Sequence, residues 1–113
     1  MPKYKMIVMS KPVAGREQEY NDWYQNVHLQ EVVAIPAIKS AQRFRLSRAL
    51  VADPEPLPYL AIYEIETDDI DGVIRELTQR ASTGGIVISA SLSNDTAAAV
   101  YEESGPVVHQ RRS

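Results

Sequence analysis

Apolar and polar positions along the chain predict a regular succession of strands and helices. Residues 4–10 contain a continuous apolar stretch, Met6 to Met9, which is typical of a strand buried on both faces. A helix is predicted over 16–27, because apolar and aromatic side chains recur there at helical spacing and acidic side chains occupy the other side. The pattern continues through residue 34 and must stop before Pro36, since the residue preceding a proline disfavours the helical conformation.

The rest of the chain predicts a similar set of elements. Strands are expected over 38–48 and 59–66, separated by a proline-rich connection, and a further strand over 98–101. A helix with an apolar stripe is expected between the last two of these strands, with Thr67 or Asp68 as its N-cap. The intervening stretch 81–97 is not assigned, and its apolar triplet at 86–88 fits either a short strand or the end of a loop.

Strict alternation over 38–48 predicts which side chains share a face of that strand. The alternation places Phe44 on one face and a basic stripe on the other. The first face carries Ile38, Ser40, Gln42, Phe44 and Leu46, and the second carries Lys39, Ala41, Arg43, Arg45 and Ser47.

The predicted order βαββαβ is that of the ferredoxin-like α+β fold, with a four-stranded antiparallel sheet and two helices on one face. With 113 residues, we expect a single domain over 1–113. The helices leave one face of the sheet uncovered. The first and third strands are apolar on both sides, and a soluble monomer rarely exposes such a patch. We therefore expect a homodimer that buries sheet against sheet, as in a dimeric α+β barrel.

Composition and charge exclude several classes of protein. The net charge of −3 lacks the basic excess of a nucleic-acid binder. The absence of cysteine excludes disulfides, iron–sulfur clusters and thiol nucleophiles, and two histidines are too few for a dedicated histidine-rich metal site. No apolar run is long enough to span a membrane, so a cytoplasmic protein is expected. We expect no metal and no cofactor, although one histidine would suffice as a haem ligand.

The main candidate for chemistry is His28, on the first helix. Tyr24 and His28 are four residues apart and therefore share a helical face, with Trp23 beside them. An imidazole on a core-facing surface has a lowered pKa, and its neutral form can act as a general base. The alternative is a structural histidine that donates a hydrogen bond to a backbone carbonyl.

The residues around His28 resemble those of a known family. The pattern Trp23-Tyr24-x-x-Val27-His28-Leu29, followed by Ile35-Pro36-Ala37-Ile38, resembles the dimeric α+β barrel superfamily and most of all its EthD-like branch. Two positions depart from the family pattern: Gln30 stands where proline is common, and Ala37 where glycine is common. The resemblance implies a sheet-on-sheet homodimer with a ligand cleft between sheet and helices. It also implies that His28 matches the family's helix histidine.

Other side chains complete the predicted site. Tyr24 is expected to orient His28 or the substrate, while Trp23, Phe44 and Tyr63 are expected to form apolar walls that bind the substrate. For Tyr63 a place in the core is the favoured interpretation, because most buried aromatic side chains pack there. The basic stripe containing Arg43 could bind a carboxylate, but pairing with Glu64 and Glu66 on the adjacent strand is favoured.

Two hypotheses for the function remain open. The first is a small cofactor-independent enzyme (a lyase, isomerase, cyclase or oxygenase) that acts on an aromatic or lactone-like catabolic intermediate, with His28 as general acid or base. The second is a non-catalytic dimeric binding or accessory protein that uses the same cleft for a small apolar molecule.

Overall fold

The chain folds as four antiparallel strands and two helical segments in the order that the sequence predicts. The computed structural model describes residues 1–51 and 53–111. The sheet has the order β2-β3-β1-β4, and every neighbouring pair is antiparallel. This is the ferredoxin-like fold, so the predicted fold class is confirmed. The strands are β1 (Lys3–Ser10), β2 (Ile38–Arg45), β3 (Tyr59–Glu66) and β4 (Ala97–Glu102).

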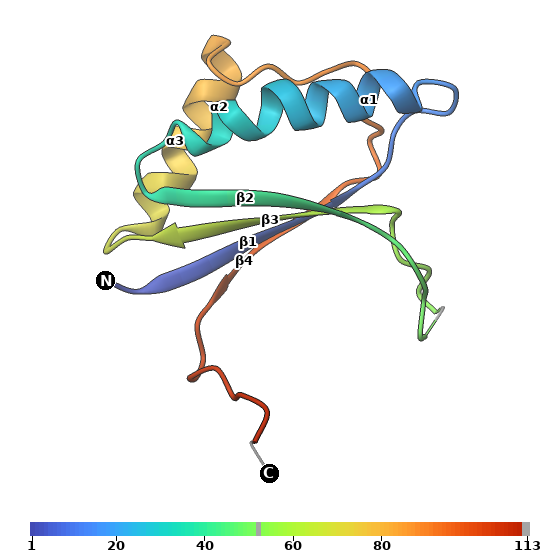
Figure 1. The fold of residues 1–113 in the computed structure, drawn as a ribbon. Helices are drawn as coiled ribbons and strands as arrows, with labels where there is room; N and C mark the ends of the chain where they lie inside the picture. The colour runs from blue at the N-terminus through green and yellow to red at the C-terminus, as the bar shows by residue number, and fades with distance from the viewer. Residues whose placement is uncertain (52, 112–113) are drawn as a thin grey trace.

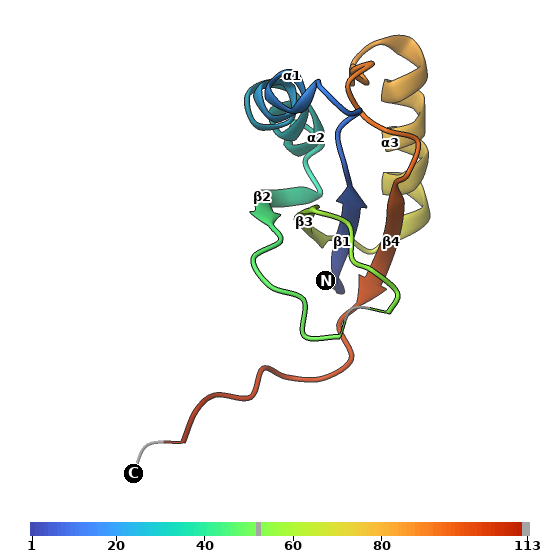
Figure 2. The same ribbon diagram turned by 90° about the vertical axis from the view of Figure 1, so that its right-hand side faces the viewer.

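The helices cover one face of the sheet and leave the other open (Figure 1). One continuous helix is built from α1 (Glu17–Trp23), η1 (Tyr24–His28) and α2 (Leu29–Val33), and a second helix is α3 (Ile70–Thr83). Figure 2 shows the two helices side by side over the same face. The core lies between them and the sheet, where twelve apolar residues form one buried cluster.

The middle of the first helix is a π-helix. The sequence predicts a helix over these residues, but its periodicity does not reveal that the turn from Tyr24 to His28 is wider than an α-helical turn. Single π-helical turns are rare and frequently occur at functional sites. Both residues predicted to carry chemistry lie within this turn, at its two ends.

The strand β2 departs from the predicted alternation. It ends at Arg45 rather than at residue 48, and a β-bulge lies between Ile38 and Ser40. Ile38 pairs with Ile65 on the helix-covered face, whereas Ser40 pairs with the open-face residue Glu64. The prediction that Ile38 shares a face with Ser40 and the later even-numbered residues is therefore wrong. One extra residue in a strand reverses the orientation of all side chains that follow it.

The helix α3 begins one residue later than expected. Its N-cap is Asp69, whose carboxylate accepts a 3.0 Å hydrogen bond from the amide of Gly72, so the prediction of Thr67 or Asp68 as the cap is wrong. The hydroxyl of Thr67 instead accepts a 3.0 Å hydrogen bond from the amide of Asp69. Gly84 ends the helix with a φ of 89°, a left-handed conformation that glycine adopts without strain.

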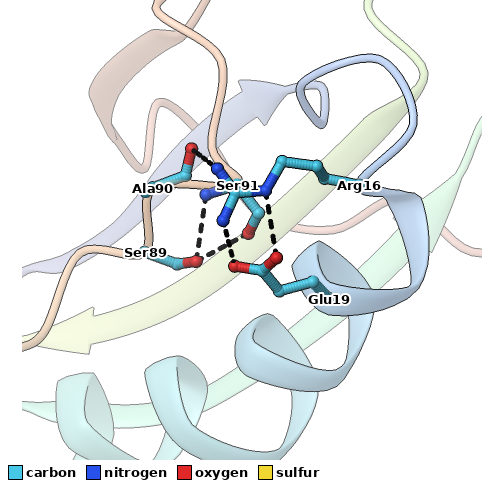
Figure 3. Close-up of polar contacts among 5 residues, drawn as sticks. All are labelled: Arg16, Glu19, Ser89, Ala90 and Ser91. Carbon is cyan, nitrogen blue, oxygen red and sulfur yellow. Dashed lines mark hydrogen bonds and ion pairs between the residues drawn. The ribbon is translucent and has the colours of Figure 1, made fainter.

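Residues 84–96 form an ordered loop, so the triplet at 86–88 belongs to a loop and not to a strand. The guanidinium of Arg16 connects this loop to α1: it binds the carboxylate of Glu19 at 2.7 Å and donates to the carbonyl of Ala90 at 3.2 Å (Figure 3). In the same loop, the hydroxyls of Ser89 and Ser91 share a 2.6 Å hydrogen bond, and Ser91 is fully buried. The loop passes over the first helix and packs against it.

The open face of the sheet is apolar at its centre. The registers place Ile7 opposite Ile62 and Met9 opposite Leu60 on this face, with small alanines of β4 beside them. Met9 and Phe44 are respectively 37% and 41% exposed. Polar side chains of β1 and β3 occupy one end, where Lys5 and Glu64 form a 2.9 Å ion pair. The structure therefore has the uncovered apolar face that the sequence predicts.

Candidate functional site

His28 lies between two aromatic rings contributed by its own helix. Its imidazole packs edge-on to Tyr24, with ring centres 5.0 Å apart, and lies in a tilted stack on Trp23 at 4.7 Å. The expected grouping of these three residues is present. Tyr24 and His28 are the first and last residues of the π-helical turn.

The imidazole of His28 is unusual in having a buried nitrogen without a partner. Among the described residues, none forms a hydrogen bond with Nδ1. Burial lowers the pKa of His28 to about 4, although the carboxylate of Glu31 acts in the opposite direction. The side chain is therefore neutral at pH 7. The interpretation of His28 as a structural residue predicts a hydrogen bond to a carbonyl, and Nδ1 makes no such bond here.

A second buried polar atom without a partner lies on the other side of Tyr24. The hydroxyl of Tyr63 is buried and has no partner in good hydrogen-bonding geometry among the described residues, although Tyr24 lies next to it. Burial raises the pKa of both phenols, so both remain protonated at neutral pH. Tyr63 is 1% exposed, in agreement with the favoured core placement. A buried hydroxyl without a hydrogen bond lowers the free energy of unfolding by about 1–3 kcal/mol, so this atom is retained at a cost in stability.

Trp23 is held in place by the loop that passes over the helix. Its indole Nε1 donates a 2.9 Å hydrogen bond to the carbonyl of Val87, and the amide of Val87 donates one of 2.9 Å to the carboxylate of Glu31. This pair of bonds fixes the indole against His28. Trp23 is 9% exposed and packs in the core beside His28.

Phe44 does not belong to this site. It pairs with Leu60 on the open face of the sheet, while Tyr63 points toward the helices. The prediction that Phe44 forms a wall of the site together with Trp23 and Tyr63 is therefore wrong. The cause is the β-bulge in β2, which places the even-numbered residues after Ile38 on the open face.

Arg43 occupies the position on the helix-covered face that the bulge makes available. The favoured pairing of Arg43 with Glu64 is wrong, because Arg43 lies opposite Ala61 and Glu64 pairs with Lys5. The guanidinium instead donates a 2.7 Å hydrogen bond to the side-chain carbonyl of Asn21. It also lies over three rings, with its Cζ 5.6, 4.8 and 5.3 Å from the centres of Tyr20, Tyr24 and Tyr59 respectively.

Sequence reasoning missed the polar network around Arg43. Asn21 donates from its amide to the hydroxyl of Tyr59 at 3.2 Å, and the hydroxyls of Ser10 and Tyr20 share a buried 2.6 Å hydrogen bond. One signal was available: Tyr20 and Tyr24 are four residues apart, so their rings share a helical face. The sequence does not indicate that an arginine would cover that face.

The described residues contain no group of three or more histidine, aspartate or glutamate side chains arranged to hold a metal ion. No helix among them has both the length and the apolar character needed to cross a membrane. Four open pockets on the described part of the chain are lined by other residues, and none of these four includes His28. Because Nδ1 is buried, a ligand that reaches it must displace neighbouring side chains.

Comparison with known proteins shows the fold. No protein-family model matches the sequence, and no curated protein matches it significantly. An EthD family protein from Bacillus halodurans is 15% identical and superposes with a TM-score of 0.60 over 92% of this chain and 100% of its own. A dimeric ferredoxin-like protein from Thermobifida fusca is 14% identical, with a TM-score of 0.61 over 90% and 92%.

A candidate monooxygenase from Shewanella loihica also matches. It is 15% identical, with a TM-score of 0.59 over 97% of this chain and 99% of its own. At these identities the likeness establishes the fold. The predicted resemblance to the EthD-like branch of the dimeric α+β barrels is therefore confirmed at the level of architecture.

Proposed function

We propose that the protein is a small enzyme that moves a proton on an aromatic or lactone-like substrate without a cofactor, with His28 as general acid or base. The observation that carries this proposal is the buried Nδ1 of His28, which has no partner among the described residues. A neutral imidazole without a protein partner retains a free site for a substrate proton. The π-helical turn around it supports a functional role.

The surroundings of His28 supply the remaining parts of the proposed mechanism. The ring of Tyr24 holds the imidazole edge-on, and Trp23 stacks on it. Both are flat apolar surfaces, which favour an aromatic ligand. The hydroxyl of Tyr63, buried beside Tyr24 and without a partner in good geometry, would donate a hydrogen bond to a substrate oxygen once a ligand displaces its neighbours. The candidate monooxygenase of the same fold agrees with an enzymatic role.

The low pKa of His28 also defines how such a base would work. A group with a pKa of about 4 is a weak base in the free protein. An anionic substrate beside the imidazole would raise this pKa toward neutrality and strengthen the base when the substrate is bound. General acid–base catalysis of this kind typically contributes ~10²–10⁴-fold in rate.

The proposed enzyme acts as a homodimer. The open face of the sheet is apolar at its centre, and sheet-to-sheet pairing of two copies would cover it. The Thermobifida fusca protein with the same fold is described as dimeric, which supports this assembly.

The test compares three proteins on a panel of phenolic acids and lactones, with turnover followed by absorbance. We expect His28→Asn to lose ~10²–10⁴-fold in rate relative to the wild type. His109→Asn removes the other histidine, which lies in the exposed C-terminal segment, and we expect it to retain full activity. Equal rates for His28→Asn and the wild type would contradict the proposal and favour the non-catalytic binding protein.

A further inference from the structure

A small cavity lies where the first helix meets the edge strand β2. It has a volume of about 270 Å³ and lies at the edge of the sheet, where it is lined by Arg43 from the helix-covered face of β2 and by Phe44 from the open face. Two arginines line it, and no carboxylate side chain does. Its lining residues are Asn21, Gln25, Arg43, Phe44, Arg45 and Tyr59.

The guanidinium of Arg43 is held in place and is not neutralised. Among the described residues, no carboxylate lies within ion-pair distance of it. One of its five N–H donors binds the Asn21 carbonyl oxygen at 2.7 Å. Asn21 is itself fixed, because its amide donates to the carbonyl of Glu17 at 2.9 Å and to the hydroxyl of Tyr59 at 3.2 Å. The arginine is therefore preorganised, and it retains donors for a ligand.

We infer that this cavity binds the carboxylate of an aromatic acid, with Arg43 as the anchoring cation. Arginine binds carboxylates through two parallel hydrogen bonds, and it does so best where its orientation is already fixed. Gln25 and Arg45 add polar and cationic groups at the rim, while the ring of Tyr59 adds a flat apolar wall. This inference rests on the proposed function, because it names the substrate class of the same site.

Tyr24 connects the cavity to His28. Its ring centre lies 4.8 Å from the Cζ of Arg43 and 5.0 Å from the ring centre of His28. The cavity is lined by neither Tyr24 nor His28, and Tyr24 is 3% exposed, so a flat acid anchored by its carboxylate at Arg43 would reach the imidazole only after these side chains move. Its negative charge would also favour protonation of His28.

The competing explanation is that Arg43 only covers the aromatic cluster through cation–π contacts, which contribute stability but bind no ligand. The two explanations differ in what they expect of small probes. We would titrate the protein with benzoate and with benzamide, which has the same shape but no charge, and measure binding by NMR or calorimetry. We expect benzoate to bind the wild type about 10- to 100-fold more tightly, the contribution of charge-assisted hydrogen bonds.

Two variants decide whether Arg43 causes the preference for benzoate over benzamide. Arg43→Gln should abolish the preference for benzoate, whereas Arg75→Gln removes one positive charge from α3 and should keep it. Should Arg43→Gln fail to fold, Arg43→Lys retains the charge over the rings but not the planar fork, and it should lower the preference. Equal binding of benzoate and benzamide to the wild type would overturn the inference, as would a preference that survives the loss of Arg43.

The same experiment separates this inference from the proposed function. His28→Asn should still prefer benzoate, because the anchoring carboxylate does not depend on the imidazole. If benzoate binds through Arg43 while His28→Asn leaves turnover unchanged, the carboxylate site at Arg43 is supported and the catalytic proposal is wrong. If His28→Asn abolishes turnover but benzoate shows no preference, the catalytic proposal stands and the substrate class is wrong.

Discussion

The imidazole of His28 stands almost perpendicular to the ring of Tyr24, at an interplanar angle of 85° with centres 5.0 Å apart. The contact is made by the ring and not by the hydroxyl, so it should survive removal of the oxygen. We expect Tyr24→Phe to leave the pKa of His28 close to that of the wild type, whereas Tyr24→Leu, which removes the ring, should let water reach the imidazole and raise that pKa. An NMR titration of the two variants checks this; a raised pKa in Tyr24→Phe would show that the hydroxyl matters.

The lowered pKa of His28 predicts a specific dependence of stability on pH. The unfolded chain takes up a proton near pH 6.5, whereas the folded chain does so only near pH 4. Between these values the unfolded state binds more protons, so the free energy of unfolding falls as the pH falls. The loss attributable to His28 is up to about 3 kcal/mol. Chemical denaturation at several pH values should show a flatter profile for His28→Gln; an identical profile would contradict the shift.

Removal of the two buried tyrosine hydroxyls should have opposite effects on the stability of the protein. Removing the Tyr63 hydroxyl, which has no partner in good geometry among the described residues, should leave stability unchanged or raise it by about 1 kcal/mol. Removing the Tyr20 hydroxyl breaks its 2.6 Å bond to Ser10 and should cost about 1–3 kcal/mol.

Thermal denaturation of Tyr63→Phe and Tyr20→Phe, matched in chemistry and in burial, compares the two. If Tyr63 also contacts the substrate, Tyr63→Phe should raise KM although the protein is no less stable. A destabilised Tyr63→Phe would mean that the hydroxyl has a partner in solution.

The open face of the sheet predicts the state of assembly. We expect a dimer at micromolar concentration, with twice the mass of the 12.6 kDa chain in light scattering. Ile62 lies opposite Ile7 near the centre of that face, so Ile62→Glu should give monomers. Ile74 is 41% exposed on α3, in the opposite layer, and Ile74→Glu should remain dimeric. A stable wild-type monomer would refute the proposed assembly.

The proposed chemistry requires no bound metal or prosthetic group. The purified protein should therefore show no absorption band in the visible range, and elemental analysis should give much less than one transition metal per chain. Treatment with EDTA should leave the rate on any substrate of the panel unchanged. A stoichiometric metal or a haem spectrum would replace the proton-transfer proposal with one in which His28 is a ligand.

The sequence predicts most of the fold because burial leaves a regular pattern. The apolar stretch in β1 and the helical spacing of Tyr20, Trp23 and Tyr24 follow directly from which side chains are removed from water. The group of His28, Tyr24 and Trp23 was predictable for the same reason, since neighbours on one helix are set by local geometry.

What the sequence does not reveal is the structure that depends on the backbone or on distant contacts. The π-helical turn changes the hydrogen bonding between Tyr24 and His28 without changing the apolar pattern. The position of Val87 over Trp23 depends on a loop that has no periodicity of its own. The placement of Arg43 on the helix-covered face depends on the bulge in β2, which the alternating pattern does not reveal.

The bulge at Lys39 also determines which changes of length in the gene this strand can tolerate. Lys39 is the extra residue between Ile38 and Ser40, so loss of its codon would restore an unbroken ladder with β3 and leave Arg43 on the helix-covered face and Phe44 on the open face. Loss of a codon between Ser40 and Arg43, with the bulge kept, would instead turn Arg43 toward the surface where a second copy is expected to dock and Phe44 toward the tyrosines. Natural sequences shortened at the second place should therefore differ in ligand and in self-association together, whereas those that lack only the bulged residue should differ in neither.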